Sequence, residues 1–334
     1  MKVAFYDTKP YDKIWFEPMM SEYGYEVKFF DNKLNEDTAV LSKGYDAVCI
    51  FVNDSATKDV INTLYQNGVK IIALRCAGYN NVDFSAAKDK ITVVRVPAYS
   101  PSAVAEFAAA LLLTVNRKTH KAYIRTKDSN FNINGLLGFD LSGKVAGIIG
   151  TGKIGQMFID ICKGFKMKVI AYDPYPNKNL DIEYVSLDEL FEKANIISLH
   201  CPLTKETYHI INEKVIKKMQ DNVLIVNTSR GSLIDTTALI EGLKSKKIGG
   251  AGLDVYEEES DIFFEDKSNE IIEDDELARL LAFPNVVMSS HQGFFTREAM
   301  QQIAMVTLEN LANFEQNTIK NEVVFENGKV VEKR

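Results

Sequence analysis

Side chains that could carry out anion binding and proton transfer stand at or just after the ends of apolar, strand-like runs: Arg230, His291 and the acids within 254–259. An arginine can hold a carboxylate through two parallel hydrogen bonds. A histidine can pass a proton to a carbonyl oxygen, and a neighbouring carboxylate favours the protonated ring. These groups suit hydride transfer between a nicotinamide and a small 2-oxo acid, a reaction in which the cofactor supplies the hydride.

Each of these residues also has an ordinary structural explanation. A single arginine at a strand end is usually part of a surface ion pair, and a glutamate within the run 257–259 is usually a solvated charge. Of the four histidines, His120 and His209 are expected to be exposed or structural, and His200 is expected to pack beside a cofactor. His291 leaves a strand into a loop of glycine and aromatic residues, which makes it the stronger candidate for proton transfer.

The stretch 145–155 joins an apolar, β-branched run to the pattern G-x-G-x-x-G. Gly150 would permit a tight turn, Gly152 would let the backbone approach a pyrophosphate, and Gly155 would let the next helix pack on the strand. The N-terminus of that helix would face the anion. The pattern predicts a helix over 153–165 with a dinucleotide site at its start.

A second strand, over 168–173, strengthens this prediction. It ends in Asp173, about twenty residues after the glycines, where an acceptor for the ribose 2′-hydroxyl is expected. The carboxylate would repel a 2′-phosphate and no arginine follows at once, so NAD is favoured over NADP. Further candidate contacts with the cofactor are Lys153, Ile154, Val104, Cys201, Pro202 and Thr228.

Strand-like runs alternate with amphipathic segments along most of the chain. Before the glycine motif the runs are 3–6, 27–30, 47–51, 71–74 and 92–96, and after it they are 168–173, 196–199, 223–227, 251–255 and 286–288. This alternation predicts parallel sheets with helices on both faces. A β-α-β unit is complete before the glycines arrive, so the nucleotide domain is the second module of the chain.

At 334 residues the chain is longer than one hydrophobic core usually serves. We therefore predict an α/β protein of two doubly wound parallel-sheet domains. Residues 1–99 and 298–334 would form the substrate domain, and residues 100–297 the NAD-binding Rossmann domain. A helix predicted over 297–316 would return to complete the first domain.

Two segments between the sheets carry separate expectations. Ser100 can cap a helix whose first residue is Pro101, and the apolar pattern over 102–127 predicts one long helix. Because this helix is apolar on several sides, it would either run between the domains or meet a second subunit. The range 256–276 is acidic and aperiodic, which predicts a solvated insertion or a short surface helix.

The composition restricts the classes of partner. The formal net charge of −7 argues against a nucleic-acid partner. No apolar run approaches membrane length and the first residues resemble a strand more than a signal peptide, so a cytoplasmic protein is expected. The four cysteines lie in apolar segments without C-x-x-C spacing, which favours buried free thiols over disulfides or a metal site.

Six segments, in order along nearly the whole chain, resemble the D-isomer-specific 2-hydroxyacid dehydrogenases, and within that family most closely the D-lactate dehydrogenase branch. The segments are 75–78, 96–101, 150–155, 226–231, 252–257 and 290–294. The resemblance implies a Rossmann NAD-binding domain inserted in a flavodoxin-like substrate domain.

The resemblance also implies roles for the residues at the strand ends. Arg230 would bind the substrate, His291 would be the acid/base, and Glu259 would pair with His291. The backbone amides of Ala77 and Gly78 would receive the substrate carboxylate.

Other residues take their expected roles from the same resemblance. Tyr99 would donate a further hydrogen bond to the substrate, Asp254 would bind the nicotinamide amide, and Asp173 would bind the adenine ribose. Apart from the resemblance, the aromatic residues Phe51, Tyr99, Phe294 and Phe295 are candidates to line a small, partly apolar cleft. Such a cleft suits a short side chain such as the methyl group of pyruvate.

The expected activity is reduction of pyruvate by NADH to D-lactate and NAD. One alternative is another 2-oxo acid: glyoxylate, hydroxypyruvate, phenylpyruvate or 2-oxoisocaproate. A second alternative is a non-enzymatic NAD-sensing scaffold, because transcriptional corepressors share this fold. The family usually dimerises through the nucleotide domain, so a homodimer or a higher homo-oligomer is expected.

Overall fold

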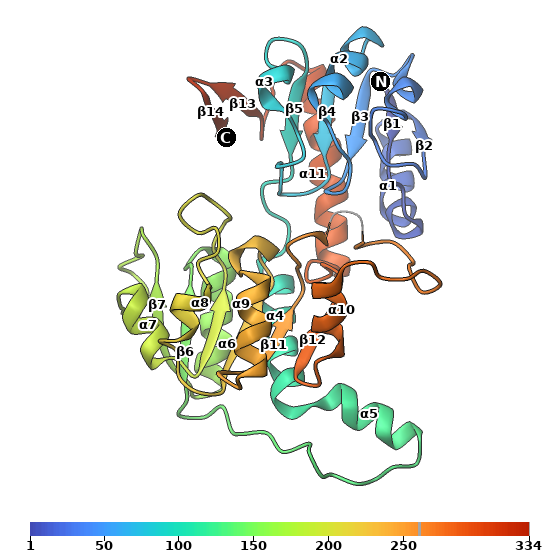
Figure 1. Ribbon diagram of the computed structural model, residues 1–334. Helices are drawn as coiled ribbons and strands as arrows, with labels where there is room; N and C mark the ends of the chain where they lie inside the picture. Colours follow the sequence, from blue (N-terminus) through green and yellow to red (C-terminus); the bar gives the residue numbers. More distant parts are fainter. Residues whose placement is uncertain (260–261, 334) are drawn as a thin grey trace. The chain divides into compact units, whose positions relative to one another are not determined.

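A computed structural model describes residues 1–259 and 262–333 (Figure 1). The chain divides into two compact units by its internal contacts. Met1–Ser100 and Phe295–Arg334 form one of them, which we call the discontinuous unit, and Pro101–Phe294 form the other, the central unit. The domain boundaries predicted after residues 99 and 297 lie close to the limits of these two units. The functions assigned to the two domains stay predictions.

The discontinuous unit is built on five parallel strands in the order β2-β1-β3-β4-β5, which is the flavodoxin-like order. The strands are β1 Lys2–Phe5, β2 Glu26–Phe29, β3 Ala47–Ile50, β4 Ile71–Leu74 and β5 Thr92–Arg95. Strands β3 and β4 are buried throughout, which explains why their sequences are continuously apolar.

The helices of this unit come from both ends of the chain. They are α1 Pro10–Glu22, η1 Ala39–Ser42, α2 Lys58–Gln66, α3 Phe84–Ala87 and α11 Arg297–Glu315. Helix α11 begins after Thr296, whose Oγ1 accepts a hydrogen bond from the Ala299 N–H at 3.2 Å. It packs against α1 and β4, so the last long helix completes the unit that the first strand begins.

A hairpin follows α11 and was not among the predicted elements. Its strands, β13 Val323–Glu326 and β14 Lys329–Glu332, pair antiparallel. Asn327 and Gly328 join them with φ of 51° and 76°, as a tight two-residue turn requires. An antiparallel bridge between Val94 and Glu322 attaches the hairpin to β5.

The central unit is built on seven parallel strands in the order β12-β11-β10-β9-β6-β7-β8. The strands are β6 Val145–Ile149, β7 Lys168–Tyr172, β8 Glu183–Tyr184, β9 Ile196–Leu199, β10 Val223–Asn227, β11 Ile248–Leu253 and β12 Val286–Met288. The winding reverses between β6 and β9, as it does in a Rossmann sheet. Two apolar clusters form the core of this unit.

The helices of the central unit are α4 Pro101–Arg117, α5 Thr119–Lys127, α6 Lys153–Gly164, α7 Leu187–Lys193, α8 Glu213–Ile216, η2 Gly231–Leu233, α9 Thr236–Lys244 and α10 Asp275–Ala282. Side-chain caps fix several starts: Ser186 Oγ accepts from the Glu189 N–H at 3.2 Å, and Asp235 Oδ1 accepts from the Ala238 N–H at 3.0 Å. Among the described residues, no helix combines the length and the apolar character needed to cross a membrane.

The single helix predicted over 102–127 is wrong. Lys118 has φ of 51°, which ends α4, and α5 then leads away from the sheet of its own unit without burying a residue (Figure 1). The Lys118 ammonium group donates to the carbonyl oxygens of Gly135 and Leu137, both at 3.0 Å. These contacts with the returning chain hold a backbone conformation that the helical pattern does not indicate.

The apolar sides of α4 are accounted for within the central unit. The helix packs against β10, β11, β12 and α6. A Cβ added at Gly252 of β11 would lie 3.0 Å from the Leu111 Cβ, so the helix lies close against this strand. Neither a path between domains nor a second subunit is needed to explain this apolar surface.

The prediction for 256–276 is only partly right. Residues 268–273 are exposed, but Tyr256 and Phe263 are each 5% exposed and belong to the core of the central unit. The Tyr256 hydroxyl donates to Asp274 Oδ2 at 2.6 Å, just before α10 begins. Residues 260 and 261 of the predicted range lie outside the described part of the chain.

Candidate active site

The polar residues predicted to carry the chemistry follow neighbouring strands of the central sheet. Strands β10, β11 and β12 are adjacent and parallel, so their carboxyl ends meet at one edge. Arg230 lies in the loop after β10, Glu259 in the segment after β11, and His291 in the loop after β12. Ligands of open parallel sheets gather at this edge.

His291 and Glu259 form a direct pair. Glu259 Oε1 lies 2.7 Å from His291 Nδ1, and the two side chains are 20% and 19% exposed. Glu259 Oε2 accepts from the Tyr256 N–H at 3.0 Å, so both carboxylate oxygens are engaged. The carboxylate is placed to orient the ring through Nδ1, which leaves Nε2 as the nitrogen for proton exchange.

Asp254 anchors the loop that carries His291. Its carboxylate accepts from Ser289 Oγ at 2.6 Å, from the Gln292 N–H at 2.9 Å and from the Gly293 N–H at 2.7 Å. Its carbonyl oxygen accepts from the His291 N–H at 2.7 Å. Burial raises the pKa of the Asp254 carboxyl, with its hydrogen bonds acting against that shift. Binding of the nicotinamide amide by Asp254 stays a prediction.

The loop after β10 is fixed directly to the segment that carries Glu259. A Cβ added at Gly231 would overlap the carbonyl group of Tyr256 and the amide nitrogen of Glu257. Only glycine permits so close an approach of two backbones. Arg230 itself is half-buried and donates from Nη1 to the Ser229 carbonyl oxygen at 2.7 Å, which leaves other guanidinium donors for an anion.

A second histidine–glutamate pair lies on the same segment and was missed. His209 Nε2 lies 2.6 Å from Glu257 Oε1, and Thr236 Oγ1 donates to Glu257 Oε2 at 3.1 Å. The His209 ring stacks on Tyr208 with centroids 3.9 Å apart. Glu257 and Glu259 each pair with a histidine, and Glu258 lies between them. Nothing in this run of three glutamates distinguishes the two that pair, so the sequence offers no signal for the contact with His209.

His200 is unsuited to proton transfer at neutral pH. Burial lowers the pKa of its imidazole to about 3, so the ring is neutral. Its Nε2 lies 2.9 Å from Ser198 Oγ, and its ring packs 5.0 Å from that of Phe158. These contacts agree with the packing role expected for it.

The glycine motif forms a tight turn with open space beside Gly152. Gly150 has φ of 94°, and a Cβ added at Gly155 would overlap the Gly150 carbonyl oxygen, so the turn and the start of α6 need both glycines. A Cβ at Gly152 would meet nothing within 4 Å. Gly152 is therefore not required by the packing of the protein itself, and the open space above it fits the close approach of a phosphate group. Lys153 and Ile154 follow as the first two residues of α6.

Asp173 is held at the end of β7 by its neighbours. Its Oδ2 accepts from the Thr151 N–H at 2.7 Å and from Thr151 Oγ1 at 3.0 Å, while its Oδ1 accepts from the Tyr175 N–H at 2.8 Å. The Tyr184 hydroxyl donates to Thr151 Oγ1 at 3.0 Å. The carboxylate thus has a fixed orientation beside the glycine motif and still has free lone pairs for ribose hydroxyls.

The remaining predicted cofactor contacts differ in character. Thr228 Oγ1 is buried and has no hydrogen-bond partner among the described residues, so it fits a group that the protein alone does not supply. Burial raises the pKa of the Cys201 thiol to about 11, so the thiol stays neutral beside Pro202. Val104 is buried in the first turns of α4.

In residues 1–259 and 262–333, no cluster of three or more His, Cys, Asp or Glu could hold a metal ion.

The predicted substrate-binding residues fall on both units. Phe51, Ala77, Gly78 and Tyr99 belong to the discontinuous unit, and Phe294 is the last residue of the central unit. Phe51 and Phe294 are buried, and Tyr99 is half-exposed. Ala77 and Gly78 lie in the loop after β4, where the Ala77 carbonyl oxygen accepts from Arg95 Nη1 at 2.6 Å.

Comparison with known proteins decides the family. Residues 109–293 match the family model described as D-isomer specific 2-hydroxyacid dehydrogenase, NAD binding domain. Over 329 residues the chain is 53% identical to a D-lactate dehydrogenase of Escherichia coli strain K12, covering 97% of this chain and 100% of that protein. The chain belongs to the D-isomer-specific 2-hydroxyacid dehydrogenases. It is thus an oxidoreductase of an NAD-dependent family.

Solved structures of this dehydrogenase family share the whole architecture. The apo-structure of D-lactate dehydrogenase from Escherichia coli has a TM-score of 0.89 at 50% identity, covering 97% of this chain and 100% of that one. An NAD-complexed D-isomer specific 2-hydroxyacid dehydrogenase from Lactobacillus delbrueckii ssp. bulgaricus has a TM-score of 0.81 at 29% identity, with coverage of 96% and 99%. The predicted fold, two parallel-sheet domains of the α/β class, is therefore confirmed.

Proposed function

We propose that this dehydrogenase reduces pyruvate to D-lactate with NADH, and that Arg230, Glu259 and His291 are its catalytic residues. The observation that carries the proposal is the His291–Glu259 pair at 2.7 Å, at the sheet edge shared with the loop of Arg230. The full-length likeness to a D-lactate dehydrogenase supports the choice of substrate.

The protein's residues divide the work of binding and proton transfer. Arg230 offers the guanidinium group that holds the substrate and balances the negative charge that develops on its carbonyl oxygen. His291, as the imidazolium, donates a proton from Nε2 to that oxygen, and Glu259 keeps its hydrogen bond to Nδ1 throughout. The amides of Ala77 and Gly78 receive the substrate carboxylate, Tyr99 donates a further hydrogen bond, and Phe51 and Phe294 line the site.

The same proposal assigns the cofactor to the motif after β6. Gly150, Gly152 and Gly155 with the start of α6 hold the pyrophosphate, and Asp173 holds the adenine ribose. Lys153, Ile154, Val104, Cys201, Pro202, Thr228 and Asp254 complete the NAD contacts. When bound, NADH supplies the hydride.

Replacement of Asp173 by Ser is expected to relax the preference for NADH over NADPH by about tenfold to a hundredfold, because the repulsion of a 2′-phosphate disappears. The ratio of kcat/KM for the two cofactors, with dissociation constants from fluorescence titration, measures the change. Asp188→Ser is the matched control, since Asp188 binds Lys218 on the surface of the same unit at 2.7 Å. An unchanged ratio in the Asp173 variant would remove its ribose role.

The substrate is tested by initial rates of NADH oxidation with pyruvate, glyoxylate, hydroxypyruvate, phenylpyruvate and 2-oxoisocaproate, followed by chiral analysis of the product. The proposal expects the highest kcat/KM with pyruvate and D-lactate as the product. A higher kcat/KM with another 2-oxo acid would identify that acid as the substrate and would leave the proposed mechanism unchanged. Inactivity on all five, with NADH still bound, would favour the NAD-sensing scaffold.

We also propose that the protein assembles as a homodimer or higher homo-oligomer through its central unit. Helix α5 buries none of its residues, and large apolar side chains on it and on the chain that follows are exposed: Tyr123, Ile124, Phe131, Ile133 and Leu137. Such a surface is typical of a subunit contact. Multi-angle light scattering should give at least twice the chain mass, and a monomer at micromolar concentration would contradict the proposal.

The expected compartment is the cytoplasm. Cys49, Cys76 and Cys162 are buried, Cys201 is half-buried, and among the described residues none of the four forms a disulfide, as is usual in a reducing compartment. Fractionation of the producing cells would test this expectation.

A further inference from the structure

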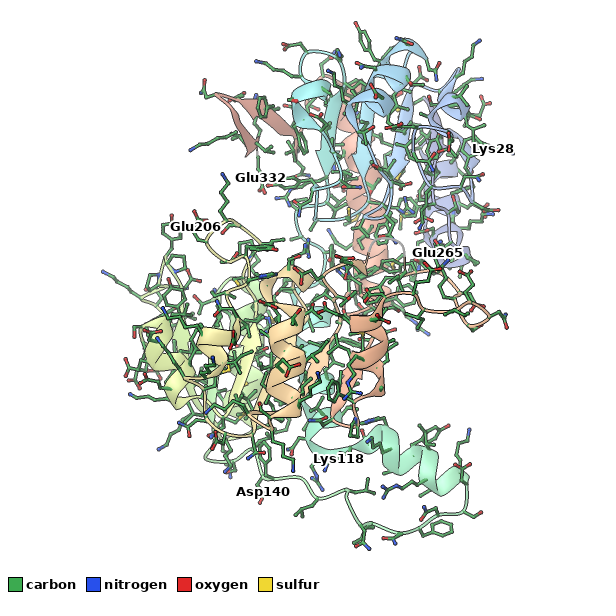
Figure 2. All side chains as sticks on the ribbon, in the orientation of Figure 1. Lys28, Lys118, Asp140, Glu206, Glu265 and Glu332 are labelled. Carbon is green, nitrogen blue, oxygen red and sulfur yellow. The ribbon has the colours of Figure 1, made fainter. Side chains whose placement is uncertain are left out.

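The hairpin at the end of the chain contacts the loop that follows β4. Arg95, the last residue of β5, donates from Nη1 to the Ala77 carbonyl oxygen at 2.6 Å, and its guanidinium lies 5.2 Å from the Tyr79 ring centroid. Glu332 on β14 forms an ion pair with Arg95 Nη2 and accepts from the Tyr79 hydroxyl at 3.2 Å. Figure 2 labels Glu332 on the hairpin. The Glu332 carboxylate therefore contacts both Tyr79, which lies in this loop, and Arg95, which binds the loop from the end of β5.

The hydrogen bond from Arg95 to the Ala77 carbonyl oxygen determines the direction of the next backbone N–H. The Ala77 carbonyl and the Gly78 N–H belong to one planar, trans peptide unit, so they point in opposite directions. When Arg95 binds the carbonyl oxygen, the Gly78 N–H is turned away from Arg95 and stays fixed in that direction.

Contacts other than those of Glu332 close the base of the hairpin and attach it to β5. The Arg95 N–H donates to the Asn321 carbonyl oxygen at 3.1 Å, and the Lys333 N–H donates to that of Glu322 at 2.8 Å. Val323 is 2% exposed. Since Arg95 is 12% exposed and Glu332 is 39% exposed, the pair is only partly screened by solvent.

We propose that Glu332 is a positioning residue for substrate binding, which acts through Arg95 and Tyr79 to aim the Gly78 amide at the substrate carboxylate. The inference rests on the proposed function, in which the Ala77 and Gly78 amides bind that carboxylate. The inference assigns a role in substrate binding to a residue that belongs neither to the loop after β4 nor to the His291–Glu259 pair.

Glu332→Gln is expected to raise the KM for pyruvate about threefold to tenfold and to leave kcat and the KM for NADH within about twofold, because a half-exposed ion pair contributes modestly. The inhibition constant of oxamate, a pyruvate analogue, should rise by the same factor. Glu326→Gln is the matched control: Glu326 binds Lys333 on the same hairpin at 2.7 Å, and none of its hydrogen bonds reaches the loop after β4. It should change none of these constants.

Tyr79→Phe provides a second test that keeps Arg95 and Glu332 in place. It should raise the KM for pyruvate less than Glu332→Gln does, and the double variant should fall short of the product of the two effects, as expected when both act on one network. An unchanged KM in both single variants overturns the inference. Parallel losses in kcat and in NADH affinity also overturn it, because they indicate general damage. Wild-type protein without 2-oxo acid reduction would refute the proposed function instead.

Discussion

His291→Gln is expected to lower kcat with pyruvate by about a thousandfold or more while NADH binds as before. Glutamine can donate a hydrogen bond, but it cannot transfer a proton to the carbonyl oxygen that accepts the hydride. The dissociation constant of NADH should be unaffected because the glycine motif and Asp173 are untouched. Stopped-flow measurement of NADH oxidation gives the rate, and fluorescence titration gives the affinity.

The chain provides its own control in a second histidine–glutamate pair. His209→Gln alters a pair with similar exposure and a similar separation, 2.6 Å against 2.7 Å, on the same segment. It should lower kcat by less than about tenfold, as a supporting residue would. If His291→Gln keeps its turnover, or if His209→Gln loses as much, the acid/base assignment is wrong.

Gly152→Ala should weaken NADH binding by about tenfold to a hundredfold and cost the cofactor-free protein no more than about 1 kcal/mol of stability, because Gly152 is the N-cap of α6. Apart from the adjoining backbone, no described atom lies within 4 Å of the added methyl group, so it obstructs a ligand that approaches the backbone there. Calorimetric titration with NADH and thermal unfolding without it measure the two effects.

Gly155→Ala is the matched comparison, and it should affect mainly the stability of the cofactor-free protein. Its Cβ would overlap the Gly150 carbonyl oxygen, so α6 must shift from β6 and the protein should lose about 1–3 kcal/mol of stability or more without any cofactor present. Normal NADH affinity in Gly152→Ala would show that the pyrophosphate does not approach this position.

The features that the sequence predicted well depend on local patterns. The strand before Gly150, the helix after Gly152 and the acid at the end of β7 each follow from periodicity and spacing within about thirty residues. Strand ends in a parallel sheet converge by topology, so the sequence alone groups the candidates at the ends of β10, β11 and β12.

The features that the sequence did not predict depend on contacts between distant segments. The helical pattern runs unbroken through Lys118, and only its bonds to Gly135 and Leu137 show why the helix ends there. The pairing of Glu257 with His209 needs the packing of the segment after β11 on the loop after β10. The contact of Glu332 with Arg95 joins the end of the chain to an early strand, which no local pattern encodes.

The construction of the discontinuous unit from both ends of the chain affects the order of its biosynthesis. Strands β1–β5 are made first, but the helix that packs on β4 and α1 is α11, which is made only after the whole central unit. Its buried residues, among them Ile303, Leu308 and Leu311, are synthesised only after the last residue of the central unit. While α11 is still inside the ribosome, the nascent chain would therefore present the central unit together with a sheet that α11 does not yet cover, a surface on which chaperones can act.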